Sequence, residues 1–156
     1  MNWKWSCFWG MLLVGQFVFF IWLALQRLIA PDEGFYVMAA KLVTQGKVPY
    51  LDFFYPQMPL LPYLHALPVK LGGPTWPAVR VLSALLASLL GLLIWRHVLD
   101  HFGKFPALLS LVLYCGSGMA FIWYSVVKAY AAAAFFLVLA FFLVESGYGK
   151  RRLGLL

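Results

Sequence analysis

Acidic residues are scarce in this chain, and most of them lie in one stretch. The 156 residues include five Asp and Glu, of which Asp32, Glu33 and Asp52 fall within residues 30–75. A carboxylate near a membrane surface can act as a general base toward a lipid-borne substrate or hold a divalent cation. Asp32 can instead cap a helix whose first turn carries Glu33. The residue types alone leave both interpretations open.

The three histidines and one lysine are further candidates for contact with a metal ion or a substrate, and each also has a less specialised explanation. His97 and His101 are four residues apart on either side of Asp100, a spacing that can hold a metal ion on one helix face. A polar turn without a metal explains them as well. His65 lies in a proline-rich stretch and either touches a substrate or is a polar side chain with its own partners. Lys128 either attracts a lipid phosphate or is an ordinary interfacial lysine.

Other catalytic signatures are absent from the sequence. It contains no glycine-rich phosphate loop, no Cys-x-x-Cys pair and no serine-nucleophile motif. Cys7 and Cys115 sit inside apolar runs, where we interpret them as small buried hydrophobic residues. The sequence therefore gives no indication of a disulfide framework.

The composition excludes an ordinary soluble domain. Hydrophobic residues make up 64% of the chain and charged residues 11%, with a mean hydropathy of +0.87, whereas soluble domains carry roughly 25% charged residues. The net charge of +7 comes from 12 Lys and Arg that are spread singly or in one short cluster. This distribution is typical of charges that flank membrane spans, so we expect membrane lipids and no nucleic acid as partners.

The apolar runs predict an all-α, polytopic fold with one membrane domain over residues 1–156. A helix needs about 20 apolar residues to cross the hydrocarbon core. The first run follows Lys4 and is too long for a cleaved signal peptide. The second crosses if Arg80 and Arg96 extend their side chains toward the two interfaces. We predict four transmembrane helices at about residues 8–29, 76–97, 105–127 and 128–146.

The stretch 30–75 is predicted to be a long extramembrane loop that carries interfacial helices. A first helix begins after Asp32 and ends at Gly46. One of its faces is apolar and is expected to lie on the membrane surface, with the residues Phe35, Met38, Ala39 and Leu42. Prolines then break the chain into turns and a short, kinked helix around 60–71. A loop of this length inside a membrane bundle favours a functional role.

Three motifs in this loop carry a resemblance to a known family. Asp-Glu-x-x-Tyr (32–36) follows the first span directly. Gly-Lys-Val-Pro-Tyr-x-Asp (46–52) and Tyr-Pro-x-x-Pro-Leu-x-x-Tyr-Leu (55–64) come after it. In order and topology, about residues 8–145 resemble the start of the C-type glycosyltransferases, which take sugars from polyprenyl phosphates. This family includes the protein O-mannosyltransferases and the lipid A aminoarabinose transferase.

The resemblance implies roles for particular residues. Asp32 matches the family's first-loop catalytic carboxylate, which acts as a base toward the acceptor or through a bound divalent cation. Glu33 would be a supporting acid, and Tyr36 a pocket or lipid-phosphate contact. The donor would be a polyprenyl-phosphate-linked sugar transferred with inversion to a lipid, glycan or protein acceptor. The remaining substrate-binding candidates are Asp52, Tyr55, His65 and Lys128.

The resemblance also implies a location and a larger protein. An even number of spans places both termini on one side, and the basic cluster 150–152 favours the cytoplasm for that side. The loop would then face the periplasm or exterior, from a bacterial inner membrane. The aminoarabinose branch has a basic residue before Pro59, where this chain has Gln57 and Met58, so that branch is disfavoured. Family members continue through many more spans, so the resemblance implies that this chain is either an N-terminal fragment of a larger enzyme or a truncated remnant, and that it is inactive alone.

Two other classes of protein remain as alternatives. A small four-span transporter would be expected to carry a strongly polar or charged residue near the middle of a span, and Gln16 is almost the only candidate here. A non-catalytic assembly protein would leave the arrangement around Asp32 unexplained.

Overall fold

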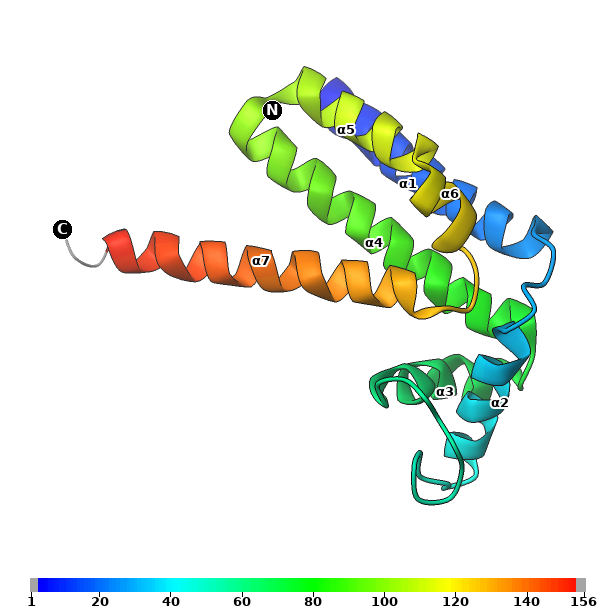
Figure 1. The fold of residues 1–156 in the computed structure, drawn as a ribbon. Helices are drawn as coiled ribbons and strands as arrows, with labels where there is room; N and C mark the ends of the chain where they lie inside the picture. The colour runs from blue at the N-terminus through cyan, green and yellow to red at the C-terminus, as the bar shows by residue number, and fades with distance from the viewer. Residues whose placement is uncertain (1–2, 154–156) are drawn as a thin grey trace.

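The structure is a computed structural model that describes residues 3–153 (Figure 1). The described residues form helices joined by turns and one long loop, with an isolated bridge between Pro49 and Phe53 and no named strand. The all-α class predicted from the sequence is confirmed. The helices are α1 (Trp3–Gln26), α2 (Glu33–Thr44), α3 (Leu60–Gly72), α4 (Trp76–Phe102), α5 (Lys104–Gly116), α6 (Gly118–Trp123) and α7 (Ala129–Leu153).

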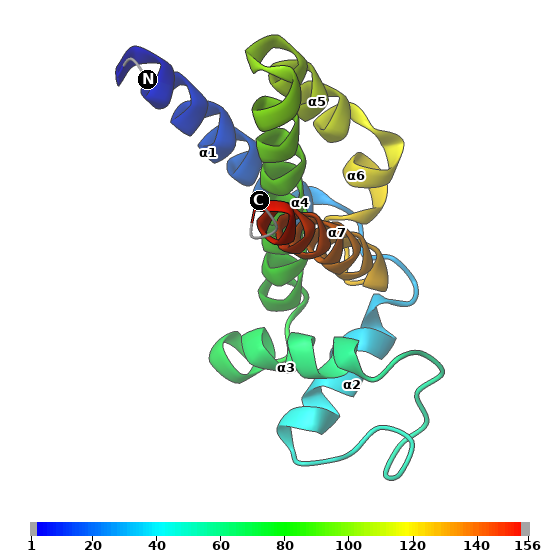
Figure 2. The ribbon, with the colours of Figure 1, turned by 90° about the vertical axis from the view of Figure 1, so that its left-hand side faces the viewer.

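Two of the described helices are long and apolar enough to cross a membrane. They are the part of α1 over Cys7–Gln26 and the whole of α4. In α5, and in the part of α7 over Ala129–Glu145, the apolar stretch is shorter. Figure 2 shows α7 crossing α4, while α2 and α3 lie together beyond the start of α4. The third and fourth spans stay predictions.

The continuous helix predicted over 105–127 is wrong, because the chain breaks at Ser117. Glycines on both sides weaken the helix there, and Ser117 adopts an extended backbone with φ −67° and ψ 138°. Its hydroxyl accepts a hydrogen bond from the Ala120 N–H at 3.2 Å and so caps α6. A turn then leads from Tyr124 into α7. Uniform hydropathy concealed this break.

The predicted helices of the long loop are present, close to their expected bounds. Gly46 follows α2 with φ +84°, a left-handed conformation that glycine adopts at little cost. Of the apolar face predicted for α2, Phe35 and Met38 are exposed, whereas Ala39 is buried. The residues that α2 buries are Glu33, Tyr36, Val37, Ala39 and Ala40. The outward apolar face remains available for the predicted contact with the membrane surface.

Packing of α1 against α4 depends on small residues. Ala84 and Ala87 of α4 are fully buried against Phe20 and its neighbours, since small side chains let two helices approach closely. Gly91 has no room for a methyl group, because its Cβ would lie 2.1 Å from the Gln16 amide nitrogen. That nitrogen donates to the Ser88 carbonyl at 3.0 Å. Gln16 therefore joins two helices.

A buried arginine holds the end of α1 and the start of α2 against α4. Arg80 does not extend outward as predicted but turns inward, where it is 4% exposed. Its Nε and Nη2 donate to the two carboxylate oxygens of Glu33 at 2.8 and 2.7 Å. Its other N–H groups reach backbone carbonyls at 2.8–3.0 Å, those of Ala24, Arg27 and Leu28. All five guanidinium donors are thus used.

Removing Arg80 should therefore destabilise the fold severely. Arg80→Ala leaves the buried Glu33 carboxylate without its cationic partner, and breaking a buried pair costs about 3–5 kcal/mol of the free energy of unfolding. Arg96→Ala is the matched control, since Arg96 pairs with Asp100 at 2.8 Å on the exposed surface and such pairs contribute about 0–1 kcal/mol. Denaturation in detergent micelles, followed by tryptophan fluorescence, measures both. Equal denaturation midpoints for the two variants would show that the buried Arg80–Glu33 pair does not hold the fold together.

Candidate functional site

Two residues singled out separately in the sequence form an ion pair. The Asp32 carboxylate lies 3.0 Å from the Lys128 ammonium. Asp32 occupies the N-cap position of α2, yet its side chain makes no capping hydrogen bond, so the capping interpretation is wrong. The Asp32 side chain is 47% exposed. A carboxylate that is ion-paired, accessible and free of a capping role can exchange its partner for a substrate.

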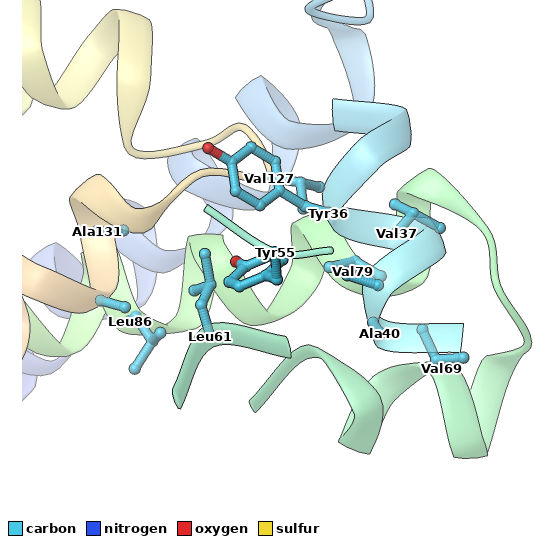
Figure 3. Packing of buried hydrophobic residues seen from close by; sticks show 12 residues of the cluster. Tyr36, Val37, Ala40, Tyr55, Leu61, Val69, Val79, Leu86, Val127 and Ala131 are labelled. Carbon is cyan, nitrogen blue, oxygen red and sulfur yellow. The ribbon is translucent and has the colours of Figure 1, made fainter. Parts of the chain in front are cut away.

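Aromatic rings fix the position of Lys128. Its ammonium lies 4.6 Å from the centre of the Trp123 ring and 5.9 Å from that of Tyr130, distances at which the faces of aromatic rings attract cations. The preceding residue, Val127, is fully buried in the cluster that includes Tyr36 (Figure 3). The turn between α6 and α7 is thereby packed against α2, which brings Lys128 to Asp32.

Tyr36 and the proline-rich segment extend the site by hydrogen bonds. The Gln57 side-chain amide donates to the Tyr36 hydroxyl at 2.8 Å, and the Tyr50 hydroxyl donates to the Gln57 carbonyl oxygen. The sequence did not mark Gln57 as a site residue. Its place in the proline-rich motif, where another branch of the resembled family has a basic side chain nearby, was the available signal.

Two adjoining hollows meet at Gln57 and Met58. One, of about 560 Å³, is bordered by aromatic and polar groups of the loop, namely Tyr50, Tyr55, Pro56, Gln57 and Met58. The other is an apolar groove of about 420 Å³ between the start of α3 and the start of α7. Its lining residues are Gln57, Met58, Leu60, Leu61, Leu64, Ala129, Ala132, Ala133 and Phe136. Lys128 directly precedes the groove residue Ala129, while its ammonium lies over the rings of Trp123 and Tyr130.

The other two carboxylates of the loop hold the backbone in place. Glu33 is fully buried, and besides Arg80 it accepts a hydrogen bond from the Ala30 N–H at 2.9 Å. Asp52 accepts from the Val48 N–H at 2.7 Å and closes a turn. Neither borders the two hollows. The structure thus favours a positioning role for both, and the catalytic role of Glu33 and the substrate role of Asp52 stay untested.

Tyr55 lies at the wall of the aromatic hollow. Its ring stacks on Phe35 with centres 5.4 Å apart and an interplanar angle of 4°. Burial is the main cause that raises the pKa of its hydroxyl above the ordinary value, with the neighbouring Tyr36 and Tyr50 adding to it. The Tyr55 hydroxyl is buried and has no partner among the described residues. It therefore stays protonated, inside the protein behind the wall of the hollow.

His65 lies away from both hollows. It is 1% exposed on the inner face of α3, between Leu61 and Val69 at four-residue spacings, and it does not border either hollow. Its Nδ1 has no hydrogen-bond partner among the described residues. Burial lowers the pKa of the imidazole to about 4. The packing favours a neutral core residue, and substrate contact by His65 stays untested.

The structure does not assemble a cation site of three ligands around Asp32. The described partner of its carboxylate is the Lys128 ammonium, and a positive charge at that distance disfavours a divalent cation. Among residues 3–153, the group that could hold a metal is His97, His101 and Glu145, at the other end of α4. A divalent cation at Asp32 remains a prediction.

Comparisons with protein-family models, with curated proteins and with solved structures find no significant match for this chain. The assignment of function therefore depends on the geometry of the site and on the motifs of the loop.

The buried His65 should make stability depend on pH. Between about pH 6.5, its ordinary pKa, and about pH 4, the unfolded chain binds a proton that the folded chain does not. Stability is therefore complete above about pH 6.5 and falls as the pH is lowered to about 4, by about 3 kcal/mol. His65→Leu should remove this slope, whereas the exposed-histidine control His101→Gln should keep it. Denaturation midpoints across this range measure the slope, and an unchanged slope in His65→Leu would contradict the assignment.

Proposed function

We propose that this chain is part of a membrane glycosyltransferase that moves a sugar from a polyprenyl phosphate to an acceptor, with Asp32 as the catalytic carboxylate. The observation that carries the proposal is the Asp32–Lys128 ion pair, whose lysine directly precedes the groove residue Ala129. The proposal joins this geometry to the Asp-Glu-x-x-Tyr and proline-rich motifs, which resemble those of C-type glycosyltransferases. Membrane association is supported by α1 and α4.

The groove suits the lipid part of such a donor. Its lining is almost wholly apolar, with the Gln57 side chain as the exception. A volume of about 420 Å³ holds a few isoprene units of a polyprenyl chain. Lys128 adjoins the groove, where a compact ammonium attracts a phosphate as a point charge. The prenyl chain would therefore lie along α3 and α7, with its phosphate at Lys128.

Phosphate binding would change the state of Asp32. A donor phosphate at Lys128 competes for the ammonium that now pairs with Asp32, which releases the carboxylate. Asp32 then accepts the proton of the acceptor's hydroxyl or amine. The acceptor atom forms the new bond to the anomeric carbon, the bond from that carbon to the phosphate oxygen breaks, and polyprenyl phosphate leaves. Attack opposite to the leaving group inverts the anomeric centre.

The remaining residues would position these groups. Glu33 and Arg80 hold the start of α2, and Asp52 shapes the loop. The hydrogen bond between Tyr36 and Gln57 connects the start of α2, next to Asp32, to the wall shared by the two hollows. In this proposal the loop faces the periplasm or exterior of a bacterial inner membrane, with the chain termini in the cytoplasm, and the aromatic hollow receives the sugar or acceptor.

Asp32→Asn should abolish sugar transfer while leaving membrane insertion intact. The substitution is made in the chromosomal gene, so that the protein has its natural length. Loss of a general base lowers the rate by about 10²–10⁴-fold, and one polyprenyl-phosphate sugar should accumulate in lipid extracts profiled by mass spectrometry.

The matched control is Asp100→Asn, which removes an acid from the far end of α4 and should leave the lipid profile unchanged. If Asp32→Asn is present in the membrane at normal abundance and its lipid profile equals that of the wild type, the catalytic assignment is wrong.

Filling the groove should block the donor. Ala133→Trp places an indole among the lining residues, whereas Ala140→Trp places one at an exposed position of α7 outside the groove. Competition with a fluorescent polyprenyl phosphate, on protein in lipid nanodiscs, should show at least tenfold weaker binding for Ala133→Trp only. Equal affinity of both variants and the wild type would place the prenyl chain elsewhere.

A further inference from the structure

We propose that His97, His101 and Glu145 form a binding site for a divalent transition metal that links α4 to α7. The site lies away from Asp32: His97 follows Arg80 by a helical rise of about 25 Å along α4. The two imidazoles come from successive turns of α4, and the carboxylate comes from α7. The inference is independent of the proposed function.

The donor atoms of the three residues converge on one point. One ligand atom from each lies within 4.8 Å of the others. His97 Nδ1 is 3.3 Å from Glu145 Oε2, and His101 Nε2 is 3.5 Å from Glu145 Oε1. Ligand atoms around a tetrahedral Zn²⁺ are about 3.3 Å apart, given bonds of about 2.0–2.1 Å. Small rotations of the partly exposed His101 and Glu145 side chains would complete the geometry.

The surroundings of His97 Nδ1 provide a second sign of a ligand. His97 Nδ1 is shielded from solvent and makes no hydrogen bond of normal geometry, even to the nearby Glu145 oxygen. The imidazole contacts the rings of Phe141 and Phe142, with centres 5.7 and 5.2 Å away, and these exclude water. In the tautomer with the proton on Nε2, the buried Nδ1 lone pair has no hydrogen-bond donor among the described residues, which is costly, and a metal ion would satisfy it.

The orientation of His101 is that of a metal ligand. Its Nδ1 lies 2.9 Å from the His97 carbonyl oxygen. Since a carbonyl can only accept, Nδ1 carries the proton, which leaves the Nε2 lone pair facing Glu145 in the neutral ring. A backbone carbonyl that orients the imidazole in this way is the usual outer partner of metal-binding histidines.

Electrostatics favours a metal over two protonated rings. The His97 and His101 ring centres are 4.3 Å apart, so two imidazolium charges would repel each other beside one carboxylate. A divalent cation accepts both neutral nitrogens and also pairs with Glu145. Nearby, Asp100 is engaged by Arg96 at 2.8 Å and therefore leaves the three ligands to the metal. Two imidazoles and one carboxylate suit Zn²⁺, with water as the fourth ligand.

Zinc titration of the full chain tests the site directly. The protein is purified without a polyhistidine tag, stripped with a chelator, placed in nanodiscs and titrated with ZnCl₂ by calorimetry. We expect one Zn²⁺ per chain, and at least tenfold weaker binding in Glu145→Gln and in His101→Gln. Co²⁺ in place of Zn²⁺ should give the visible absorption of a four-coordinate ion, which is lost in the same variants.

Asp100→Asn is the matched control, because it removes a neighbouring acid but no ligand, and it should bind Zn²⁺ like the wild type. If either Glu145→Gln or His101→Gln is not monodisperse, the zinc affinity of the other variant tests the site. The site is wrong if the wild type binds no stoichiometric Zn²⁺ or if the folded ligand variant keeps wild-type affinity. A loss of affinity in Asp100→Asn equal to that in the ligand variants would also overturn it, because it would indicate binding by surface charge.

Discussion

The hydrogen bonds of the buried Arg80 guanidinium hold the end of α1 and the start of α2 against α4. The guanidinium is buried on α4, and its five N–H donors go to Glu33 and to three carbonyls at the end of α1 and in the turn that follows. A buried charge is costly unless it is paired and fully hydrogen-bonded. The exit of α1, the turn and the entry of α2 are consequently fixed to α4 as one unit. The positions of Asp32 and of the cluster around Tyr36 follow from this arrangement.

The adjacent acids Asp32 and Glu33 have different roles in the structure. Neighbouring residues at a helix start point in different directions, so Glu33 faces α4 while Asp32 faces the turn before α7. Glu33 is fully buried and holds the fold, whereas Asp32 is half-exposed and meets Lys128. The inward acid fixes the backbone that presents the outward one. Asp32 is therefore the acid of the two that a molecule outside the fold can reach.

The sequence was informative wherever periodicity or local chemistry decides the structure. Helices in the long loop, the stop at Gly46 and the candidates Asp32 and Lys128 were all predictable from it. Contacts between residues distant in the chain were not predictable, because no periodicity in the sequence connects Glu33 to Arg80. The break at Ser117 was missed because hydropathy is uniform there, although the flanking glycines were a visible sign. Gln57 was overlooked because its role arises only when the loop folds onto Tyr36.

Both helices that line the groove pack against α4. At its start, Arg80 fixes α2, against which α3 packs to form one wall. The other wall is the first part of α7, and Phe136 and Glu145 lie on the same continuous helix. The part of α7 that lines the groove ends at Phe136, about two and a half helical turns before Glu145. A groove built in this way keeps its shape as long as both of its helices stay packed against α4.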